Sequence, residues 1–567
     1  MVILGGCVAW PLACDSGTQR CDKGVYDGGR CTAPFDVAVN GHGFRPSDSK
    51  LGTIRSPADA FAVRRVADDG EVIAGKVQGP NPRTDASEDA WVLDFSELRE
   101  PGEYYVETDM GLRSDGFLVA RDVYEVPLRM ALLGLYGQRC GAAVEFEHGG
   151  EHYSHGICHV TPAEPYPSSG VGGRKDVSGG WHDAGDYGKY SVNGAFSAAF
   201  LLYAWERFGE SLAGISHVPG YDDELPGLLA EAAWELDWLV KMQSKDGGVA
   251  HQVRPARYEG SIMPSNDTAP RYISQPSSAA TADVAAVMAL GARLFEAWDQ
   301  ARSDSYRQVA MDARAWLEEN SGLVVADQSF WPNVTYGDQS DDDERLWADI
   351  EWWRSTRDVA LRERLESALG GYEGVSTSWD WQQVANLGVF AYLLDGDSTR
   401  SSEIVDLLSR LVVTGADELV ERSESHAYGR GVESYYWGSN GVVARSCMNL
   451  LAASELTGEP RYERACAKQL GHLLGRNYFG RSQITGLSYR PPLAPHHRPS
   501  QADGATDPWP GLLVGGPNVS STDNPRLLPG TPAATAWFDS SEDYFTNEVA
   551  INWNAALVYA TAGLLGD

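Results

Sequence analysis

The sequence is poor in basic residues and in long hydrophobic runs. It has 46 lysines and arginines against 79 aspartates and glutamates, which gives a formal net charge of −33. A charge this negative argues against nucleic acid or an anionic membrane as the partner and suits a neutral substrate, although solubility or adaptation to salt explains it equally well. No run approaches the roughly 20 apolar residues that span a bilayer, so we expect no transmembrane segment.

Cysteine is also scarce, and half of the eight cysteines lie in a glycine- and aspartate-rich leader, residues 1–33. These four are Cys7, Cys14, Cys21 and Cys31. A disulfide-linked or lipidated leader predicts an extracellular or cell-surface protein. The segment LGGC that ends at Cys7 resembles a bacterial lipobox, but no basic region precedes it, so chance is the alternative explanation. In contrast, Cys447 and Cys466 lie in apolar helical stretches and are expected to be inert core thiols.

The 567 residues exceed what one hydrophobic core usually holds, so we expect a large and a small domain. Residues 34–121 contain short β-rich runs separated by turns, which predict an immunoglobulin-like β-sandwich with a structural role. In residues 122–567 apolar side chains recur at helical spacing between long loops. This pattern predicts a mainly α fold, a helical barrel or toroid with its chemistry in the loops. A helical solenoid is the alternative, but no fixed sequence period supports it.

The strongest local pattern is DVSGGWHDAGDYGKY at residues 176–190. Its carboxylates Asp183 and Asp186 are three residues apart among glycines, which allow a tight loop and close approach of a ligand. Such a pair can hold a water molecule for catalysis. A calcium loop, or a turn with solvated acids, is the structural alternative.

A second pattern lies near the C-terminus, where Glu548 precedes an apolar helical run from Val549 to Leu565. A carboxyl group at the start of a helix can simply complement the helix dipole. Between Tyr544 and Trp553 it can instead be partly desolvated, which raises its pKa as a general acid requires.

A third pattern is the loop PHHRPS at residues 495–500. Its prolines stiffen a loop that carries His496 and Arg498, whose side chains suit sugar hydroxyls. The 18 Trp, 25 Tyr and 15 Phe residues also fit carbohydrate binding, because aromatic rings stack on the apolar faces of sugars. Large helical cores use the same aromatic residues, and surface loops often carry such charges.

Together these three patterns resemble glycoside hydrolase family 9, a family of many endoglucanases. They occur in the family order, and YWGSN at 436–440 and LVGGP at 513–517 also match. The resemblance covers roughly residues 122–567, and the β-module resembles the immunoglobulin-like domain of one subgroup. It implies an (α/α)6 barrel and hydrolysis of β-1,4-glucan with inversion.

Site residues follow from the resemblance. Asp186 is expected to be the general base that activates water, Asp183 to help hold that water, and Glu548 to be the general acid. The residues expected to bind glucosyl units are His496, Arg498, Trp437, Tyr544 and Trp553. Inversion requires the acid and the base to lie about 6.5–9.5 Å apart with water between them.

The resemblance also implies metals. Cys140, Cys158, His159 and His182 match the ligands of a structural zinc in the subgroup, and thiolates with imidazoles suit tetrahedral zinc. A Cys140–Cys158 disulfide is the alternative. The acidic run that contains Asp343 and Glu344 resembles a family calcium loop, although such a run is often only a solvated face.

Two departures from the family concern the cleft. Trp553 stands where many relatives have tyrosine, and the stretch 518–536 is longer than usual. Both bear on the substrate and the mode of cutting more than on the mechanism.

The leading hypothesis is therefore a monomeric endo-acting cellulase. An exo-acting enzyme of the same family, releasing glucose, cellobiose or glucosamine, is the first alternative. A non-catalytic glycan-binding protein is the second, although a binder needs no acid and base pair.

Overall fold

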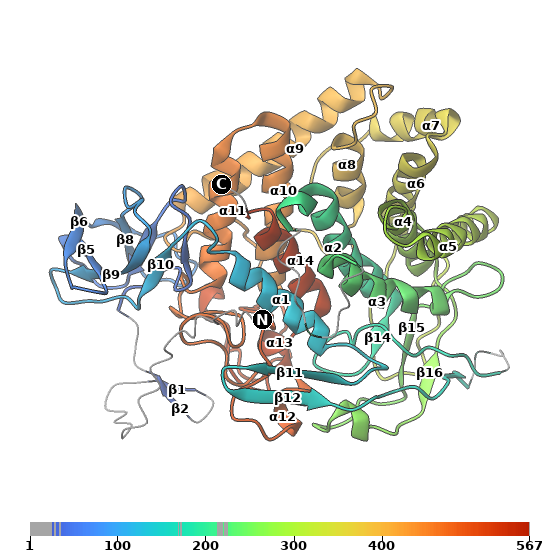
Figure 1. Cartoon of the computed structure of the whole chain (residues 1–567), viewed down its shortest axis with the longest axis horizontal. Coiled ribbons are helices and arrows are strands. Elements are labelled where there is room, and N and C mark those ends of the chain that lie inside the picture. The colour runs from blue at the N-terminus through green and yellow to red at the C-terminus, as the bar shows by residue number, and fades with distance from the viewer. Residues whose placement is uncertain are drawn as a thin grey trace, which may run out of the picture.

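The computed structural model describes residues 36–565, except 168, 170–172, 213–218 and 220–224, together with a short hairpin, β1 (Val25–Asp27) and β2 (Arg30–Thr32). Two parts follow each other along the chain: a β-rich module and a larger helical domain (Figure 1). The side chains of the leader cysteines, Cys7 included, lie outside the described residues.

The β-rich module is a sandwich of two sheets. One sheet has the order β3-β10-β9-β5-β6 and the other β4-β8-β7. The strands are β3 (Gly43–Phe44), β4 (Leu51–Ile54), β5 (Ala60–Arg65), β6 (Glu71–Lys76), β7 (Gln78–Asn81), β8 (Ala90–Asp94), β9 (Gly102–Thr108) and β10 (Phe117–Val119). Alternate residues such as Phe61 and Val63 point inward and form one apolar core with Phe95, as period-two strands require.

The helical domain is a barrel of paired helices. Six inner helices form the ring: α2 (Ser191–Leu212), α4 (Ser278–Phe295), α6 (Asp342–Thr356), α8 (Ala385–Leu393), α10 (Ser439–Thr457) and α14 (Ile551–Ala562). Six outer helices pack against them: α1 (Glu125–Gly137), α3 (Gly227–Met242), α5 (Gln300–Glu319), α7 (Val359–Leu369), α9 (Ser402–Ser425) and α11 (Pro460–Leu473). The predicted helical barrel with an N-terminal β-sandwich is thus confirmed.

The inner and outer helices differ in how much of their surface is buried. α4 is buried along almost its whole length, whereas α5 buries only one stripe that includes Tyr306 and Ala313. A helix surrounded by protein can be apolar on every side, and one at the surface is amphipathic. Of the helices in the described residues, α4 alone has the length and apolar composition to cross a membrane, and most of it lies inside the barrel.

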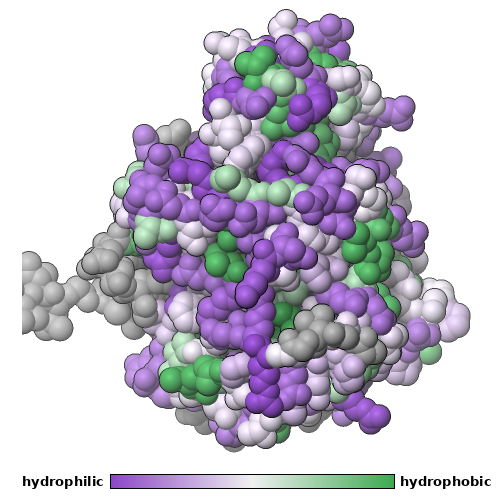
Figure 2. All heavy atoms as spheres, turned by 90° about the vertical axis from the view of Figure 1, so that its right-hand side faces the viewer, coloured by the Kyte–Doolittle hydropathy of each residue, from purple (hydrophilic) through white to green (hydrophobic). Residues whose placement is uncertain are grey.

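The surface of the molecule is mainly hydrophilic where Figure 2 shows it, and hydrophobic residues there form separate patches.

Cys447 on α10 and Cys466 on α11 form a disulfide that links an inner helix to an outer one. The expectation of two inert thiols was wrong. Both residues do lie in apolar helical stretches, but the packing of α10 against α11 brings their Cα atoms to 4.8 Å, within the range that a disulfide can bridge.

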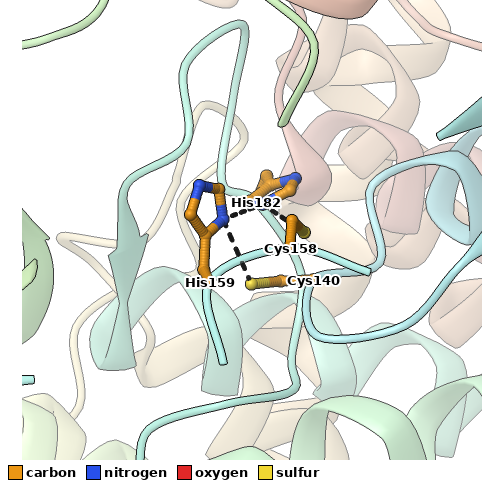
Figure 3. A group of neighbouring side chains, drawn as sticks. All are labelled: Cys140, Cys158, His159 and His182. Atoms are coloured by element: carbon orange, nitrogen blue, oxygen red, sulfur yellow. Dashed lines mark hydrogen bonds between the residues drawn. The ribbon is translucent and has the colours of Figure 1, made fainter. Parts of the chain in front are cut away.

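The loops that enter the inner helices all lie at one end of the barrel. A small sheet joins two of them, the loops before α2 and α4, with the order β13 (Glu164–Pro165), β16 (Arg271–Ile273), β15 (Gln252–Pro255) and β14 (Lys189–Tyr190). A hairpin of β11 (Val144–His148) and β12 (Glu151–His155) and the short helices α12 (Arg498–Ala502) and α13 (Tyr544–Asn547) complete this end (Figure 1). The two cysteines and two histidines of Figure 3 also lie here.

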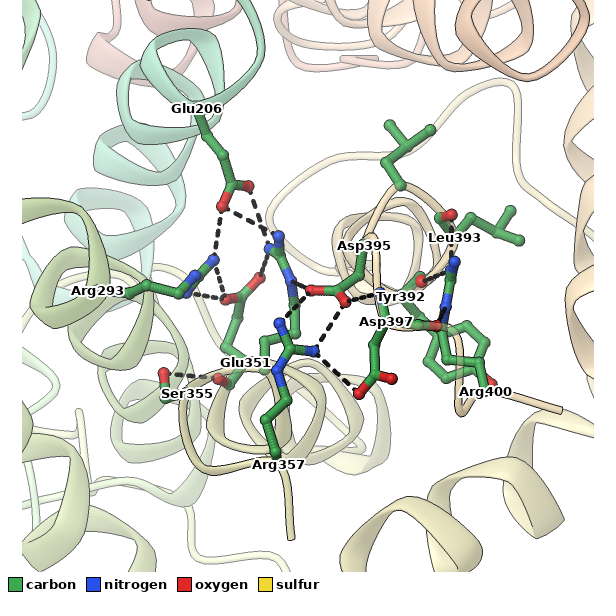
Figure 4. Close-up of polar contacts among 12 residues, drawn as sticks. Glu206, Arg293, Glu351, Ser355, Arg357, Tyr392, Leu393, Asp395, Asp397 and Arg400 are labelled. Atoms are coloured by element: carbon green, nitrogen blue, oxygen red, sulfur yellow. Dashed lines mark hydrogen bonds and ion pairs between the residues drawn. The ribbon is translucent and has the colours of Figure 1, made fainter. Parts of the chain in front are cut away.

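The opposite end of the barrel holds a buried network of ion pairs (Figure 4). Arg354, on the last turn of α6, contacts Glu206 of α2, Glu351 of its own helix and Asp395 just after α8. Arg293 of α4 reaches Glu206 and Glu351 as well. Burial alone would raise the pKa of Glu206, but Arg354 and Arg293 outweigh it and lower that pKa. The network thus joins four inner helices.

The β-module contacts the barrel through charged and polar groups. Asp85 accepts hydrogen bonds from Arg422 at the end of α9 and from Tyr435 in the loop before α10. Its main-chain oxygen accepts the amide hydrogen of Ala534. Thr53 of β4 donates to the carbonyl of Ala427. The module is therefore attached to the loops that lead into α10 and α14.

Replacing Arg354 by methionine should destabilise the barrel strongly. The substitution keeps the bulk but removes the cation that Glu206, Glu351 and Asp395 share. Arg293 and Arg357 still pair with these carboxylates, so we expect a cost at the lower end of the about 3–5 kcal/mol that loss of a buried ion-pair partner typically brings. The matched control is Arg174→Met, because Arg174 pairs with Glu164 at the surface and such pairs contribute about 0–1 kcal/mol. Differential scanning calorimetry should show a much lower Tm for Arg354→Met alone; equal shifts would refute this role of the network.

Candidate active site

The loop before α2 carries two carboxylates that differ in exposure. Asp183 is buried and Asp186 is half-buried. The Asp183 amide donates to the carbonyl of Gly188 at 2.9 Å, and the Gly188 amide donates to Oδ1 of Asp186 at 2.5 Å. These short-range bonds fix both carboxylates in one tight turn, as the glycine-rich sequence predicts.

Asp183 is held by two side chains that the sequence patterns did not reveal. Asn193 Nδ2 donates to its Oδ1 and the Tyr336 hydroxyl donates to its Oδ2, each at 2.7 Å. Burial raises the pKa of Asp183 to about 7, although these two donors oppose the shift, and the neighbouring Asp186 adds to it. Asn193 lies on α2 and Tyr336 lies 153 residues away in sequence, so no local spacing connects them to the loop.

Glu548 lies in extended backbone between α13 and α14 rather than on the first turn of the final helix. The helix-dipole interpretation is therefore wrong for this residue. Trp437 Nε1 donates to Oε2 of Glu548 at 3.1 Å. Burial raises the pKa of Glu548 well above its ordinary value, and the negative charges of Asp186 and Asp183 raise it further. A carboxyl group in this state keeps a proton that it can donate.

Backbone contacts bring the two carboxylate-bearing segments together. The Ile551 amide donates to the carbonyl of Asp183 at 2.9 Å, and Ala184 pairs with Ala550 in an antiparallel bridge. A Cβ atom on Gly185 would lie 2.1 Å from the carbonyl oxygen of His496, so only glycine permits this approach. Segments from the beginning and the end of the helical domain thus meet at one site.

The PHHRPS loop adds polar groups to the site. His496 Nδ1 lies 2.6 Å from the Ser541 carbonyl oxygen and must carry the hydrogen, which leaves Nε2 as an acceptor. Burial lowers the pKa of His496. Arg498 donates through Nε to the carbonyl of Glu259 at 2.9 Å, and its buried Nη1 has no hydrogen-bond partner among the described residues. An imidazole acceptor and a guanidinium donor in the same loop suit the hydroxyl groups of a sugar.

Two exposed aromatic rings border Glu548. Trp437 is 38% exposed and Tyr544 is 42% exposed, and their ring centroids are 5.7 Å apart. Trp553 differs from the expectation of a residue that contacts the substrate. It is 6% exposed and lies under the turn that follows Trp437, where a Cβ on Gly438 or Gly441 would collide with its indole ring. Trp553 therefore packs against the turn that follows Trp437 and supports it, rather than facing the substrate.

Cys140, Cys158, His159 and His182 form one cluster whose ligand atoms all lie within 4.8 Å of one another (Figure 3). Both cysteines are free thiols, so the alternative of a disulfide is wrong. The sulfur–nitrogen and nitrogen–nitrogen distances are 3.6, 3.8 and 3.1 Å. Bonds of about 2.0–2.3 Å in a zinc tetrahedron put ligand atoms about 3.3–3.8 Å apart, so this donor set fits zinc.

A second cluster consists of carboxylates around the start of α6. Glu344 and Asp283 are fully buried, and none of their carboxylate oxygens has a hydrogen-bond partner among the described residues. Asp343 and Asp338 lie close enough to raise the pKa of both groups, although burial is the larger cause. The sequence predicted Asp343 and Glu344; Asp283 on α4 and Asp338 are additions. Oxygen atoms of this kind suit calcium.

A partly desolvated carboxyl group, a neighbouring pair of carboxylates and exposed aromatic rings within a helical barrel are features that a glycoside hydrolase requires. The comparison with known proteins agrees. The model of glycosyl hydrolase family 9 matches residues 124–561, and that of the cellulase N-terminal immunoglobulin-like domain matches residues 33–111. The chain belongs to glycosyl hydrolase family 9.

Individual relatives extend over nearly the whole chain. Endoglucanase D of Acetivibrio thermocellus is 37% identical over 93% of this chain and 83% of its own length. A cellodextrinase of Butyrivibrio fibrisolvens is 34% identical over 93% of this chain and 99% of its own. The crystal structure of a metagenome-derived family 9 endoglucanase has a TM-score of 0.86 at 32% identity and covers 94% of this chain and 99% of that one.

Replacing Glu548 by glutamine should stabilise the protein at neutral pH. The folded-state pKa of Glu548 is raised, so its contribution to stability is full below the unfolded pKa of about 4.3 and declines as the pH rises through the folded-state value. Glutamine carries no charge and escapes this penalty. We expect a Tm about 2–4 °C above the wild type at pH 7 and a smaller difference at pH 4.

The matched contrast is Asp539→Asn, because Asp539 accepts hydrogen bonds from Arg481 and from two backbone amides. This variant should lower the Tm at pH 7. A Glu548→Gln protein that is less stable than the wild type at pH 7 would contradict the desolvated state of Glu548.

Proposed function

We propose that the chain hydrolyses internal β-1,4-glucosidic bonds of cellulose-type glucans with inversion, with Asp186 as general base and Glu548 as general acid. The observation that carries this proposal is the backbone pairing that brings the Asp183–Asp186 loop and Glu548 to one site. Family membership and relatives named endoglucanase D and cellodextrinase support the substrate class.

Each group has a role that its surroundings support. The raised pKa keeps Glu548 protonated, and Trp437 orients the carboxyl group through Oε2. The Gly188 amide fixes the carboxylate of Asp186, which is exposed enough to take a proton from water. Asp183 accepts one hydrogen bond at each oxygen and has lone pairs left for that water.

Glucosyl units are proposed to lie on the exposed rings of Trp437 and Tyr544, with hydroxyl groups at Nε2 of His496 and at the guanidinium group of Arg498. The apolar face of a sugar ring fits such aromatic surfaces, and the two polar groups fix its orientation. A site in which aromatic rings bind the faces of the ligand and polar groups bind its hydroxyls suits a neutral polysaccharide better than a charged ligand.

We also propose a structural zinc on the Cys140–His182 cluster and a calcium ion among Asp283, Asp338, Asp343 and Glu344. Zinc would fix the segment beside the catalytic loop, because His182 directly precedes Asp183. Calcium would neutralise carboxylates that are otherwise buried without a counterion. Its loop also carries Tyr336, the donor to Asp183.

We further propose that the protein is a monomer and that it acts at the cell surface or outside the cell. The Cys447–Cys466 disulfide supports an oxidising compartment, and a lipid on Cys7 would provide an anchor. Mass spectrometry of the leader from membranes of the native host tests the anchor; an unmodified Cys7 in a released protein would rule it out. A dimer in size-exclusion chromatography with light scattering would contradict the monomer.

The anomeric form of the first products tests the mechanism. In a proton-NMR time course on cellohexaose, inversion should give the α-anomer first, and endo cleavage should give several internal products. Early β-anomer would refute inversion, and a single terminal product would indicate an exo-acting enzyme.

The variant Glu548→Gln in the same assay should lower kcat by about 10²–10⁴-fold while binding persists, since a positioned acid contributes that much. Glu542→Gln is the control, because Glu542 is an exposed carboxylate in the same segment that pairs with Arg526. Equal activity of Glu548→Gln and the wild type would refute the assignment of the acid; binding of glucan without cleavage by the wild type would establish a binding protein.

Metal analysis tests both ions. The purified protein should contain one zinc per chain. After removal of metals, added calcium should raise the Tm of the wild type but not of Asp283→Asn, because that variant loses a buried ligand. A Tm that does not respond to calcium in the wild type would exclude the calcium site.

A further inference from the structure

Gln138, at the end of α1, contacts two loops of the candidate active site. Its main-chain oxygen accepts the amide hydrogen of His182 at 2.7 Å, and its side-chain Nε2 donates to the carbonyl of Ala184 at 2.8 Å. These two bonds hold the backbone on both sides of Asp183. Its Oε1 lies 3.1 Å from Nε2 of His497 in the PHHRPS loop. One residue thus contacts the loop that carries the proposed base and the loop that is proposed to bind glucosyl units.

The orientation of the Gln138 amide follows from its contact with Ala184. A main-chain carbonyl only accepts hydrogen bonds, so the oxygen of Ala184 must face the NH2 group of Gln138. Oε1 then faces His497 and can only accept. Nε2 of His497 must therefore carry the hydrogen of the ring.

The other side of the His497 ring leads independently to the same arrangement. Nδ1 of His497 accepts the main-chain amide hydrogen of Ser500 at 3.4 Å and lies 2.8 Å from the Ser500 hydroxyl. A main-chain amide only donates, so Nδ1 carries a lone pair and the ring hydrogen is on Nε2. The Ser500 hydroxyl accepts the amide hydrogen of Trp509 at 2.9 Å and donates to Nδ1. One consistent chain of hydrogen bonds therefore runs from Trp509 through His497 and Gln138 to Ala184.

The end of α1 is a firmly held support for these bonds. Gln138 is 3% exposed. The helix packs so closely that a Cβ on Gly134 would lie 2.5 Å from Nδ2 of Asn554 on α14. The same Nδ2 donates to the carbonyl of Ala131 at 3.1 Å. Because α14 begins just after Glu548, the position of Gln138 is set by the helix that follows the proposed acid.

The two loops also touch each other directly, beside the contacts of Gln138. The Arg498 amide donates to the carbonyl of Gly185 at 3.0 Å. The residues that the Gln138 side chain bonds, Ala184 and His497, directly precede these two in sequence. The side chain thus adds a second connection between the loops, parallel to the main-chain bond.

We propose that Gln138 is a positioning residue that fixes the Asp183–Asp186 loop relative to the PHHRPS loop, and so the base relative to the bound glucan. This inference rests on the proposed function. The bond to Ala184 acts on the carboxylates and therefore on kcat, whereas the bond to His497 acts on the sugar-binding side chains and therefore on KM. Such bonds matter because a displacement of about 1 Å in a reacting group can cost about 10²-fold in rate.

Steady-state kinetics on cellohexaose test the proposal. Gln138→Met keeps the bulk but loses both side-chain contacts, so we expect kcat to fall about 10–100-fold and KM to rise. His497→Phe keeps a ring against Trp509 and leaves the bond to Ala184 intact, so KM should rise with little change in kcat. Adding Gln138→Met to His497→Phe should raise KM no further, because Gln138 acts on KM through His497.

The matched control is Gln243→Met. Gln243 ends α3 as Gln138 ends α1, and its Nε2 donates to the carbonyls of Gly247 and Val309. This variant should lower the Tm but keep the kcat and KM of the wild type. Wild-type kinetics in Gln138→Met, or equal losses of kcat in both variants, would overturn the role of Gln138 and leave the proposed function intact. A wild type that cleaves no glucan would overturn both.

Neutron diffraction from crystals of the wild type gives an answer even if Gln138→Met does not fold. Deuterium should lie on Nε2 of His497, directed at Oε1 of Gln138, and the ND2 group of Gln138 should face the carbonyl of Ala184. Deuterium on Nδ1 of His497 alone, or an amide of Gln138 in the reverse orientation, would refute the chain of hydrogen bonds and with it the proposal.

Discussion

The backbone contact between the Asp183–Gly185 segment and the Ala550–Ile551 segment is the constraint on which the rest of the site depends. α2 follows the first segment and α14 begins within the second, so their hydrogen bonds join the beginning and the end of the ring of inner helices. The barrel can bury its apolar inner helices only when this ring is closed. The same closure places the two carboxylate-bearing segments together, so formation of the core and assembly of the site are one event.

This closure has an electrostatic cost. It packs Glu548 and Asp183 into a region where burial and neighbouring negative charge raise the pKa of each. Hydrogen bonds from Tyr336 and Trp437 offset part of that cost. The two candidate metal clusters adjoin these residues in sequence, since His182 directly precedes Asp183 and Asp338 lies two residues after Tyr336. Cations there would fix the donors that the buried acids need, which would give both candidate metal clusters a common role beside the Asp183–Asp186 loop.

Sequence patterns predicted the parts of the site whose members are close in sequence or that match whole family motifs. Asp183, Asp186 and the cluster of Cys140, Cys158, His159 and His182 belong to this group, and the structure brings the segment that carries Glu548 to the Asp183–Gly185 segment. Asn193, Tyr336, Gln138 and Asp283 could not be predicted, because each is an isolated polar residue that acquires its partner only through the tertiary fold. The error on Cys447 and Cys466 has the same origin, since helical periodicity reveals burial but not which helices pack together. Trp553 shows the converse limit: an aromatic residue within a site motif can face the core.

The β-module shows how a part without catalytic residues can still constrain the cleft. Its sequence predicted only a structural role, and the contacts of Asp85 give that role a location. Arg422, Tyr435 and the Ala534 amide all converge on this one residue, whose φ of 54° turns its backbone toward the barrel. Tyr435 lies two residues before Trp437, and Ala534 lies in the long stretch that precedes Glu548. Since Trp437 in turn bonds to Glu548, the module contacts both the segment that carries the exposed Trp437 ring and the segment that leads to Glu548.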